Sequence, residues 1–196
     1  MKLDKNDMLK SILEHISGLD YIKTADIPNI ELYMDQVTTF MDSQMASSKR
    51  YPDDKVLTKT MINNYAKNHL LPSPNKKKYS KEHVLMLIFI YYFKSFLSIS
   101  DIQALLTPLA DKYFQKNNGL NMEYLYNEVF GMEKEQVENL KKDLMEKYQT
   151  ASQSFAEAEE KDREFLTMFS FICLLSFDVY MKKQLIESII DSFPSD

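Results

Sequence analysis

The chain has 196 residues, 44% of them hydrophobic, with only three glycines and six prolines, which predicts an ordered, helix-rich protein and excludes a low-complexity chain. Acidic residues outnumber basic ones by 29 to 24, and the single cysteine, Cys173, excludes an internal disulfide framework. One unpaired thiol fits a reducing compartment, and the chain does not open with a cationic, apolar leader. We therefore expect a cytoplasmic protein.

Two helices are predicted in the first 45 residues. The first runs from Leu3 to Ser17, where apolar residues recur at helical spacing and Gly18 stands where the helix would end. The second starts with Asn29 as its N-cap and ends near Met45. It directs four side chains toward a core: Leu32, Val37, Phe40 and Met41.

The segment from Leu57 to Asn68 predicts a capped helix with two distinct faces. Thr58 is the expected N-cap, and Leu57 and Ile62 stand at the two positions of a hydrophobic staple. Helical spacing turns Met61, Ile62 and Tyr65 inward and leaves a polar face of Lys59, Thr60, Asn63, Asn64 and Lys67. Lysine suits phosphate, asparagine suits adenine, and threonine suits backbone or the thymine methyl group. The alternative is an ordinary solvated helix face.

A basic loop follows this helix. Pro72 and Pro74 favour extended backbone, and Asn75 is suited to begin a turn. Three lysines, Lys76, Lys77 and Lys78, come next without an acid among them. A stiffened strand, a basic tip and a return strand ending at Tyr79 would form a wing. A solvated loop is the alternative.

The charge distribution is uneven along the sequence. Between Lys55 and Lys94 there are eight lysines and one acid, Glu82, so this stretch carries +7 and the remainder of the chain carries −12. Such segregation predicts a basic head on an acidic body, able to turn one face toward a polyanion.

Further helices are predicted after the loop. Ser80 and Ser98 are expected N-caps, each with a stapling pair, and Asp101 places a carboxylate at the third position of its helix. The boundary of the head is expected at Asn117–Gly119. The helices expected beyond it are 121–130, closed by Gly131, then 133–148 and 157–193.

Two apolar runs, Val84–Phe93 and Phe165–Phe177, are shorter than the ~20 residues that cross a bilayer, so both are expected to be core helices. The second run is apolar nearly all round, and the chain offers few helices to cover it. We therefore expect a second subunit to cover part of it.

Residues for catalysis are sparse. His15, His69 and His83 are far apart in the sequence, and there is one cysteine, so the spacing predicts neither a zinc site nor a Cys–His nucleophile. The sequence has no Gly-rich phosphate loop. His83 is expected in the first turn of a helix rather than as a ligand. The acidic cluster at 157–164 is interrupted by Lys161 and Arg163, as in a solvated helix start. We expect no enzyme activity, no metal and no cofactor.

The stretch from Leu57 to Leu106 resembles the DNA-binding head of MerR-type regulators. The matching residues are Tyr65, Leu70, Leu71, Pro72, Tyr79, Ser80, Glu82, Ser98, Ile99, Ile102, Leu105 and Leu106. Two positions depart from that pattern: Asn63 replaces an arginine, and His69 replaces the glycine that ends the helix.

The chain resembles more closely a family of uncharacterised bacterial proteins that carry a domain of unknown function, number 1836. The motifs that carry this resemblance are IPNIELYMDQVTTFMD at 27–42 and LTKTMINNYAKN at 57–68.

Together these features predict an all-α protein with a MerR-like winged helix-turn-helix head, a small β wing and a C-terminal helical bundle. The expected regions are 1–26, an N-terminal helix and connection; 27–118, the DNA-binding domain; and 119–196, a dimerisation or effector domain. The expected function is transcriptional regulation through double-stranded DNA, as a homodimer, with a small-molecule effector left open. The residues expected at the DNA are Thr58, Lys59, Thr60, Asn63, Asn64, Tyr65, Lys67, Lys76, Lys77, Lys78 and Tyr79. The alternative function is a protein-interaction adaptor on the same scaffold.

Overall fold

A computed structural model describes residues 10–14, 16, 21–116 and 119–194, and shows a largely helical chain with one small antiparallel sheet. The chain divides into two compact units. The first, Leu19–Met132, is called the head unit here; the second, Met1–Gly18 with Glu133–Asp196, is called the hairpin unit. His15, Gly18 and residues 117–118, which entered the sequence predictions, lie outside the described residues.

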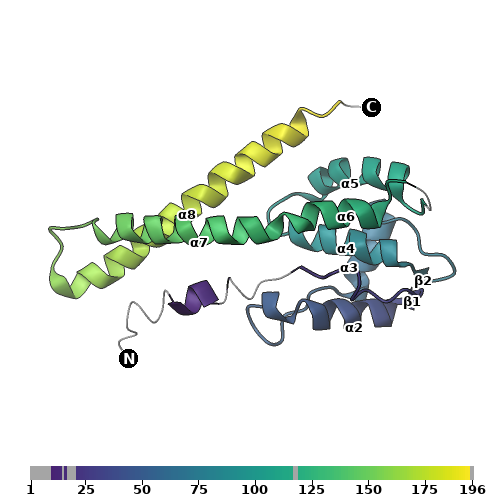
Figure 1. Cartoon of the computed structure of the whole chain (residues 1–196), viewed down its shortest axis with the longest axis horizontal. Coiled ribbons are helices and arrows are strands. Elements are labelled where there is room, and N and C mark those ends of the chain that lie inside the picture. The colour runs from purple at the N-terminus through teal and green to yellow at the C-terminus, as the bar shows by residue number, and fades with distance from the viewer. Residues whose placement is uncertain (1–9, 15, 17–20, 117–118, 195–196) are drawn as a thin grey trace. The chain divides into compact units, whose positions relative to one another are not determined.

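The head unit contains two short strands and five α-helices among its described residues (Figure 1). In chain order its elements are β1 (Leu32–Tyr33), α2 (Met34–Gln44), the 3-10 turn η1 (Ala46–Ser48), α3 (Lys59–Lys67), β2 (Lys78–Tyr79), α4 (Lys81–Phe93), α5 (Ile99–Tyr113) and α6 (Met122–Gly131). The centre of the core is α4, which is buried without interruption from His83 to Ile90 and contacts α5, α6 and β2. The prediction that the first apolar run is a core helix is confirmed.

The predicted boundary after residue 118 is wrong, because α6 belongs to the head unit. Three of its side chains, Met122, Tyr126 and Phe130, are buried, and the Tyr126 hydroxyl donates to the backbone oxygen of Ile22 at 2.6 Å. The described N-terminal helical residues, 10–14 and 16, group with the C-terminal helices instead of forming a region of their own.

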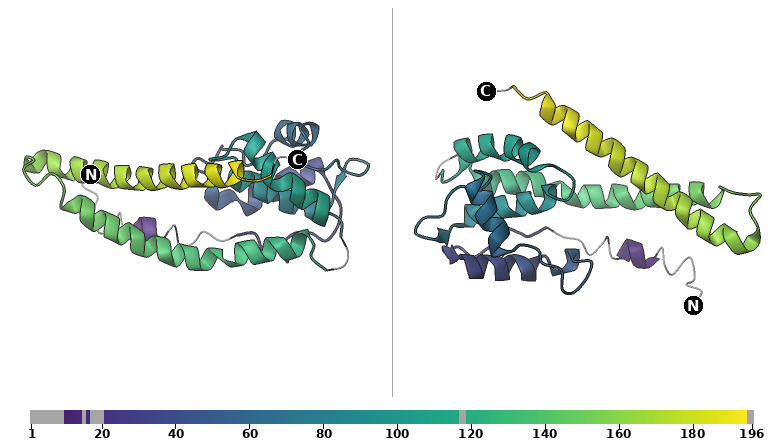
Figure 2. Two further views of the ribbon diagram at one scale, coloured as in Figure 1. Left: turned by 90° about the horizontal axis from the view of Figure 1, so that it is seen from above. Right: turned by 180° about the vertical axis from the view of Figure 1, so that it is seen from behind.

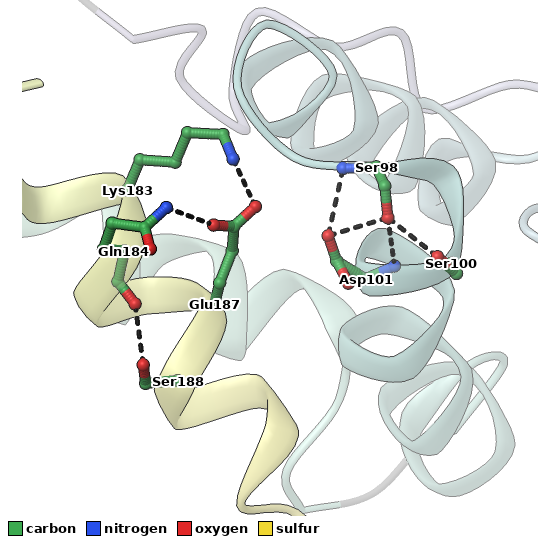
Figure 3. Close-up of polar contacts among 7 residues, drawn as sticks. All are labelled: Ser98, Ser100, Asp101, Lys183, Gln184, Glu187 and Ser188. Carbon is green, nitrogen blue, oxygen red and sulfur yellow. Dashed lines mark hydrogen bonds and ion pairs between the residues drawn. The ribbon is translucent and has the colours of Figure 1, made fainter. Parts of the chain in front are cut away.

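Three of the four predicted N-caps of the head unit are present. Thr58 Oγ1 accepts from the Met61 amide at 3.2 Å. Ser98 Oγ accepts from the Asp101 amide at 3.1 Å, while the Ser98 amide donates to Asp101 Oδ2 at 3.1 Å, a reciprocal capping box (Figure 3). Ser80 caps α4 together with His83. The stapling side chains are all buried: Leu57 with Ile62, Tyr79 with Val84, and Leu97 with Ile102.

The predicted start of the second helix at Asn29 is wrong, because α2 begins at Met34. The backbone of Leu32 and Tyr33 is instead extended and pairs with β2. The Tyr33 amide donates to Gln36 Oε1 at 2.8 Å, which satisfies one donor at the new helix start. Leu32, Val37 and Met41 are buried as predicted.

The strand partners also differ from the predicted wing. The return strand β2 pairs with β1 in the register Leu32↔Tyr79 and Tyr33↔Lys78. Within the basic loop only the bridge Asn75↔Lys78 forms, because Pro72 and Pro74 have no amide hydrogen to donate to a ladder. All views in Figures 1 and 2 place β1, β2 and the loop that precedes β2 at one end of the head unit.

The end of α3 keeps a left-handed turn although glycine is absent. His69 has φ 57°, the Leu70 amide donates to the Tyr65 oxygen at 2.9 Å, and the His69 amide donates to the Ala66 oxygen at 3.2 Å. These are the two bonds of a Schellman motif. The replacement of glycine by His69 therefore leaves the turn geometry intact, at the cost of a conformation that side chains disfavour.

The hairpin unit is built on α7 (Glu133–Ser152) and α8 (Glu160–Asp191). Its core is the buried cluster Leu144, Ala151 and Phe171, against which Leu13 and Ile16 of the N-terminal helical residues pack, as predicted. Tyr148 lies edge-on to Phe171 at 5.5 Å, and Lys147 of α7 pairs with Asp178 of α8 at 2.9 Å. Figures 1 and 2 show α8 crossing α7, with its C-terminal half leaving α7.

The prediction that Phe165–Phe177 is a core helix is wrong. Only Thr167, Phe171 and Ile190 of α8 are buried, whereas Phe165 is 71% exposed and Ile172 57% exposed. The run also belongs to a helix of 32 residues, so the length argument against a membrane span does not apply to it. By length and composition alone, α8 could cross a bilayer.

The left-handed turn at His69 gives a stability prediction. His69 is exposed, so His69→Gly should remove the cost of the left-handed conformation without losing packing. We expect the free energy of unfolding to rise by up to about 1 kcal/mol in urea denaturation. His69→Ala keeps the left-handed cost and should leave stability close to that of the parent chain. A lower stability for His69→Gly than for His69→Ala would contradict the turn geometry.

Candidate nucleic-acid interface

The two faces of α3 separate as its sequence predicts. Ile62 and Tyr65 are buried and Met61 is half-buried, which fixes the inward face on the core. The outward face carries no apolar side chain, and its five polar residues are all exposed: Lys59, Thr60, Asn63, Asn64 and Lys67. This face presents ammonium, amide and hydroxyl groups to the solvent.

The basic loop ends in a tight turn over Asn75–Lys78. The Lys78 amide donates to the Asn75 oxygen at 2.9 Å, and the two central residues, Lys76 and Lys77, have φ of 48° and 65°. Positive φ at both central positions is the mark of a type I′ turn, which normally carries Asn-Gly. Both lysine side chains are exposed.

The fold brings α3 and this turn to the same place, the first turn of α2. Lys59 of α3 forms an ion pair with Asp35 of α2. Two residues before Asp35, the Tyr33 ring lies 5.8 Å from the Lys78 ammonium, which also pairs with Glu31 at 3.9 Å. The start of α3 and the base of the turn therefore converge on residues 31–35. We use the name basic surface for the exposed groups Lys59, Thr60, Asn63, Asn64, Lys67, Lys76 and Lys77.

The predicted contrast between a basic head and an acidic body is wrong at the scale of the two units. The head unit has 13 basic and 12 acidic residues, a net charge of +1, and the hairpin unit carries −6. The fold places acids that precede Lys55 in the sequence beside the lysines. Besides Asp35 and Glu31, Asp42 pairs with Lys49 at 2.7 Å, and this hydrogen bond holds the pKa of Asp42 below its usual value. The basic surface is therefore a local group of four lysines on a head unit that is nearly neutral as a whole.

Within the part of the chain that the structure describes, three lysines of the basic surface form no ion pair: Lys67, Lys76 and Lys77. These ammonium groups are the ones free to bind an anion from outside.

Four of the residues predicted at the DNA make contacts within the head unit. Tyr65 and Tyr79 are 7% and 2% exposed, and burial raises the pKa of both hydroxyls, so neither ring offers a contact surface. Thr58 uses its hydroxyl as the cap of α3. Lys78 is half-buried and already engaged by Tyr33 and Glu31. These four position the basic surface.

Sequence reasoning missed two features next to the basic surface. Tyr33 is 55% exposed beside the turn, but the sequence placed it inside a helix. An open groove also runs between α2 and the start of α3. Its lining residues are Thr38, Thr39, Asp42 and Ser43 of α2, together with Lys55, Leu57, Thr58 and Lys59. The threonine pair on α2, Thr38 and Thr39, is the sequence feature that could have indicated the groove. Whether these threonines are exposed depends on where α3 crosses α2, which the sequence does not show.

His83 anchors the base of the basic loop. Its Nδ1 accepts from the Ser80 amide at 3.0 Å and lies 2.8 Å from Ser80 Oγ, so the ring is part of the cap of α4. Tyr79 and Phe114 lie edge-on at 5.5 and 4.8 Å. Its Nε2 is buried without a hydrogen-bond partner. Burial lowers the pKa of His83, and the nearby backbone of Ser73 and Pro72 opposes this shift only in part. The prediction of a first-turn residue is confirmed.

Two further features bear on the predicted metal and effector calls. No group of three or more His, Cys, Asp or Glu side chains there could hold a metal ion. The second cleft of the head unit is open and lined largely by charged and amide side chains, including Glu31, Lys81 and Glu123. A small-molecule effector stays a prediction.

Comparison with known proteins gives one match. A family model described as a domain of unknown function (DUF1836) matches residues 22–129, which nearly coincide with the head unit. No curated protein and no solved structure is detectably similar to the chain.

The buried His83 predicts a pH dependence of stability. The unfolded ring titrates near pH 6.5, whereas the folded ring has a lowered pKa, so the unfolded state binds more protons in the interval between the two values. Stability should be full above that interval and fall as the pH drops below about 6.5, by up to about 1.4 kcal/mol per pH unit.

His83→Asn offers an acceptor near the position of Nδ1 and removes the titration. Urea denaturation between pH 7 and 5 should show a shallower pH dependence for this variant, with lower stability at pH 7 because the ring packing is lost. His69→Gln, which changes an exposed ring, should keep the parental slope. Parallel curves for the parent and His83→Asn would exclude His83 as the titrating group.

Proposed function

The chain belongs to the family of the domain of unknown function DUF1836, whose model covers nearly the whole head unit. We propose, from the geometry of the head unit, that the protein binds duplex DNA through the basic surface and regulates transcription. In this proposal the head is a winged helix-turn-helix of MerR-like type. The turn at Asn75–Lys78 is its wing.

The observation that carries the proposal is the backbone conformation of Lys76 and Lys77. Each is held at positive φ, where a residue other than glycine costs roughly 1–2 kcal/mol. A turn selected for stability would carry asparagine and glycine here. Strain of this kind is retained where side chains serve a function, and two exposed ammonium groups side by side suit the phosphates of a nucleic acid.

The geometry of α3 fits the second half of the proposal. The helix has nine residues and is about 14 Å long, and its diameter of about 10–12 Å matches a major groove about 12 Å wide. Asn63 and Asn64 would face base edges, where an asparagine amide pairs with adenine. Lys59 and Lys67 would bind phosphates on either side, and the caps and staples hold the helix rigid against the core.

A turn variant tests the proposal without damage to the fold. Lys76→Asn with Lys77→Gly removes two charges but supplies the residues that a type I′ turn prefers. The free energy of unfolding should rise by about 1 kcal/mol, while affinity for duplex DNA should fall. In gel-shift titrations on fragments of the organism's own genome, the slope of log affinity against log salt should drop by about two per subunit.

The matched control is Lys142→Gln with Lys161→Gln, which removes two exposed charges from the hairpin unit. This control should keep the parental affinity and salt slope. An unchanged affinity for the turn variant, or equal losses in both double variants, would reject the basic surface as the DNA site.

The ion pair between Asp35 and Lys59 predicts a gain of binding. Asp35→Asn releases the Lys59 ammonium for phosphate and removes one negative charge from the interface. We expect DNA affinity to rise a few-fold at low salt, since each added phosphate contact steepens the salt dependence by about one. Asp111→Asn, the same charge change on α5, should have a smaller effect. Equal effects of the two variants would mean that Lys59 does not contact the duplex.

The near-neutral charge of the head unit favours one other function, a protein-interaction adaptor. Asp35, Glu31 and Asp42 neutralise the lysines with which they pair, which lowers the attraction of the head unit for a polyanion. The adaptor would show no salt-sensitive binding to duplex DNA and would hold a protein partner at the same surface. Retention of that partner by the parent chain and its loss in the turn variant would support it.

A further inference from the structure

The exposed side of α8 carries a regular apolar seam. Phe165, Phe169, Ile172, Ser176 and Val179 follow one another at alternating spacings of four and three residues, the spacing of positions a and d in a coiled coil. Phe165, Phe169, Ile172 and Val179 are exposed by 71%, 50%, 57% and 64%. The seam continues at its ends into Asp162 and Lys183, at the same spacings.

The seam lies opposite the side of α8 that α7 covers. Thr167 and Phe171 are buried, and Asp178 is held by Lys147 of α7, so helical periodicity places these residues on the other side from Ile172. The seam is therefore unpartnered within the hairpin unit. A contiguous apolar stripe of this length on a helix marks an interaction surface.

We propose that the seam pairs with the same seam of a second copy of the chain, in antiparallel orientation, with Ile172 near the two-fold axis. Self-complementarity about Ile172 is what an isologous two-fold interface requires. The proposal is independent of DNA binding, because it uses only residues of α8.

The charges at the two ends of the seam decide the orientation. The N-terminal end of α8 is acidic, with Glu159, Glu160, Asp162 and Glu164 against Lys161 and Arg163, and the seam's other end is basic, with Lys182 and Lys183. A parallel pair would place Asp162 against Asp162 and Lys183 against Lys183. An antiparallel pair places each acidic end beside the basic end of the other copy, which flanking charges in coiled coils are known to select.

The two lysines at the basic end of the seam differ in their pairing within α8. Within α8 it pairs with Glu187, which Gln184 also contacts at 3.1 Å (Figure 3). Lys182 is 70% exposed at the side chain and only loosely paired with Asp178, at 3.6 Å. Lys182 is thus the more available cation for the acidic end of a second copy.

A lipid bilayer is the competing occupant for an apolar helix of this length. Asp178 lies in the apolar stretch between Glu164 and Lys182 and pairs with Lys147. The hydrocarbon core of a bilayer disfavours such an internal carboxylate. The side of α8 that carries Asp178 packs on α7, whose charged side chains could not follow it into lipid. Because one side of α8 packs on the charged helix α7 and only the other side is apolar and exposed, a protein partner is favoured over a bilayer.

Disruption of the seam tests the pairing in the full-length chain. Ile172→Glu should raise the dimer dissociation constant at least about thirtyfold in analytical ultracentrifugation, because a carboxylate would be buried at the centre. Met181→Glu is the matched control: Met181 is 58% exposed on α8 but off the seam, so this variant should stay dimeric. A monomeric parent chain at tens of micromolar, or equal dissociation constants for the two variants, would overturn the proposal.

Spin labels test the orientation. With Cys173→Ser as background, a nitroxide on Lys161→Cys should lie about 35 Å from its counterpart in an antiparallel pair centred near Ile172, from a rise of 1.5 Å per residue. A distance below about 20 Å would indicate a parallel pair and overturn the proposal. Co-sedimentation of the parent chain with phosphatidylcholine and phosphatidylglycerol vesicles, lost in Ile172→Glu, would overturn it in favour of a membrane. The turn variant at Lys76 and Lys77 should still dimerise, which separates this test from that of DNA binding.

Discussion

The arrangement of the head unit depends on the pairing of β1 with β2. Each strand has only two residues, but the pair Leu32↔Tyr79 joins the segment before α2 to the segment before α4. Tyr79 is buried and its ring contacts His83 of α4, so the central helix holds β2 in place. Everything at the candidate interface follows from this pairing. It places the lysine turn beside the first turn of α2, where α3 also begins.

The interface shows a balance between charge and stability. Two lysines are held in a left-handed conformation at the turn, and His69 ends α3 in the same region of backbone space. Each such residue lowers stability by about 1 kcal/mol or more. The acids at residues 31, 35 and 42 offset repulsion among neighbouring lysines through ion pairs. Exposed ion pairs contribute at most about 1 kcal/mol, so their larger effect is on the field that an incoming polyanion meets.

The hairpin unit, unlike the head unit, has little buried surface. Its core is small, consisting of a few side chains where α7 and α8 cross, and α8 continues past that crossing with apolar groups exposed. Only three side chains of this 32-residue helix are buried, so packing within the hairpin unit stabilises a small part of its surface. Pairing of the seam between two copies would bury Phe165, Phe169, Ile172 and Val179, which are exposed in the single chain.

The sequence by itself determined the local features: the caps at Thr58, Ser80 and Ser98, the two faces of α3 and the burial of α4. These depend on side chains within four residues of one another, so short-range spacing is enough to predict them. Tertiary structure alone decided the strand partner of Lys78, the inclusion of α6 in the head, the acids set beside the lysines and the exposure of α8. Each of these joins segments far apart in the chain, and their pairing depends on how whole surfaces pack, which residue spacing does not encode.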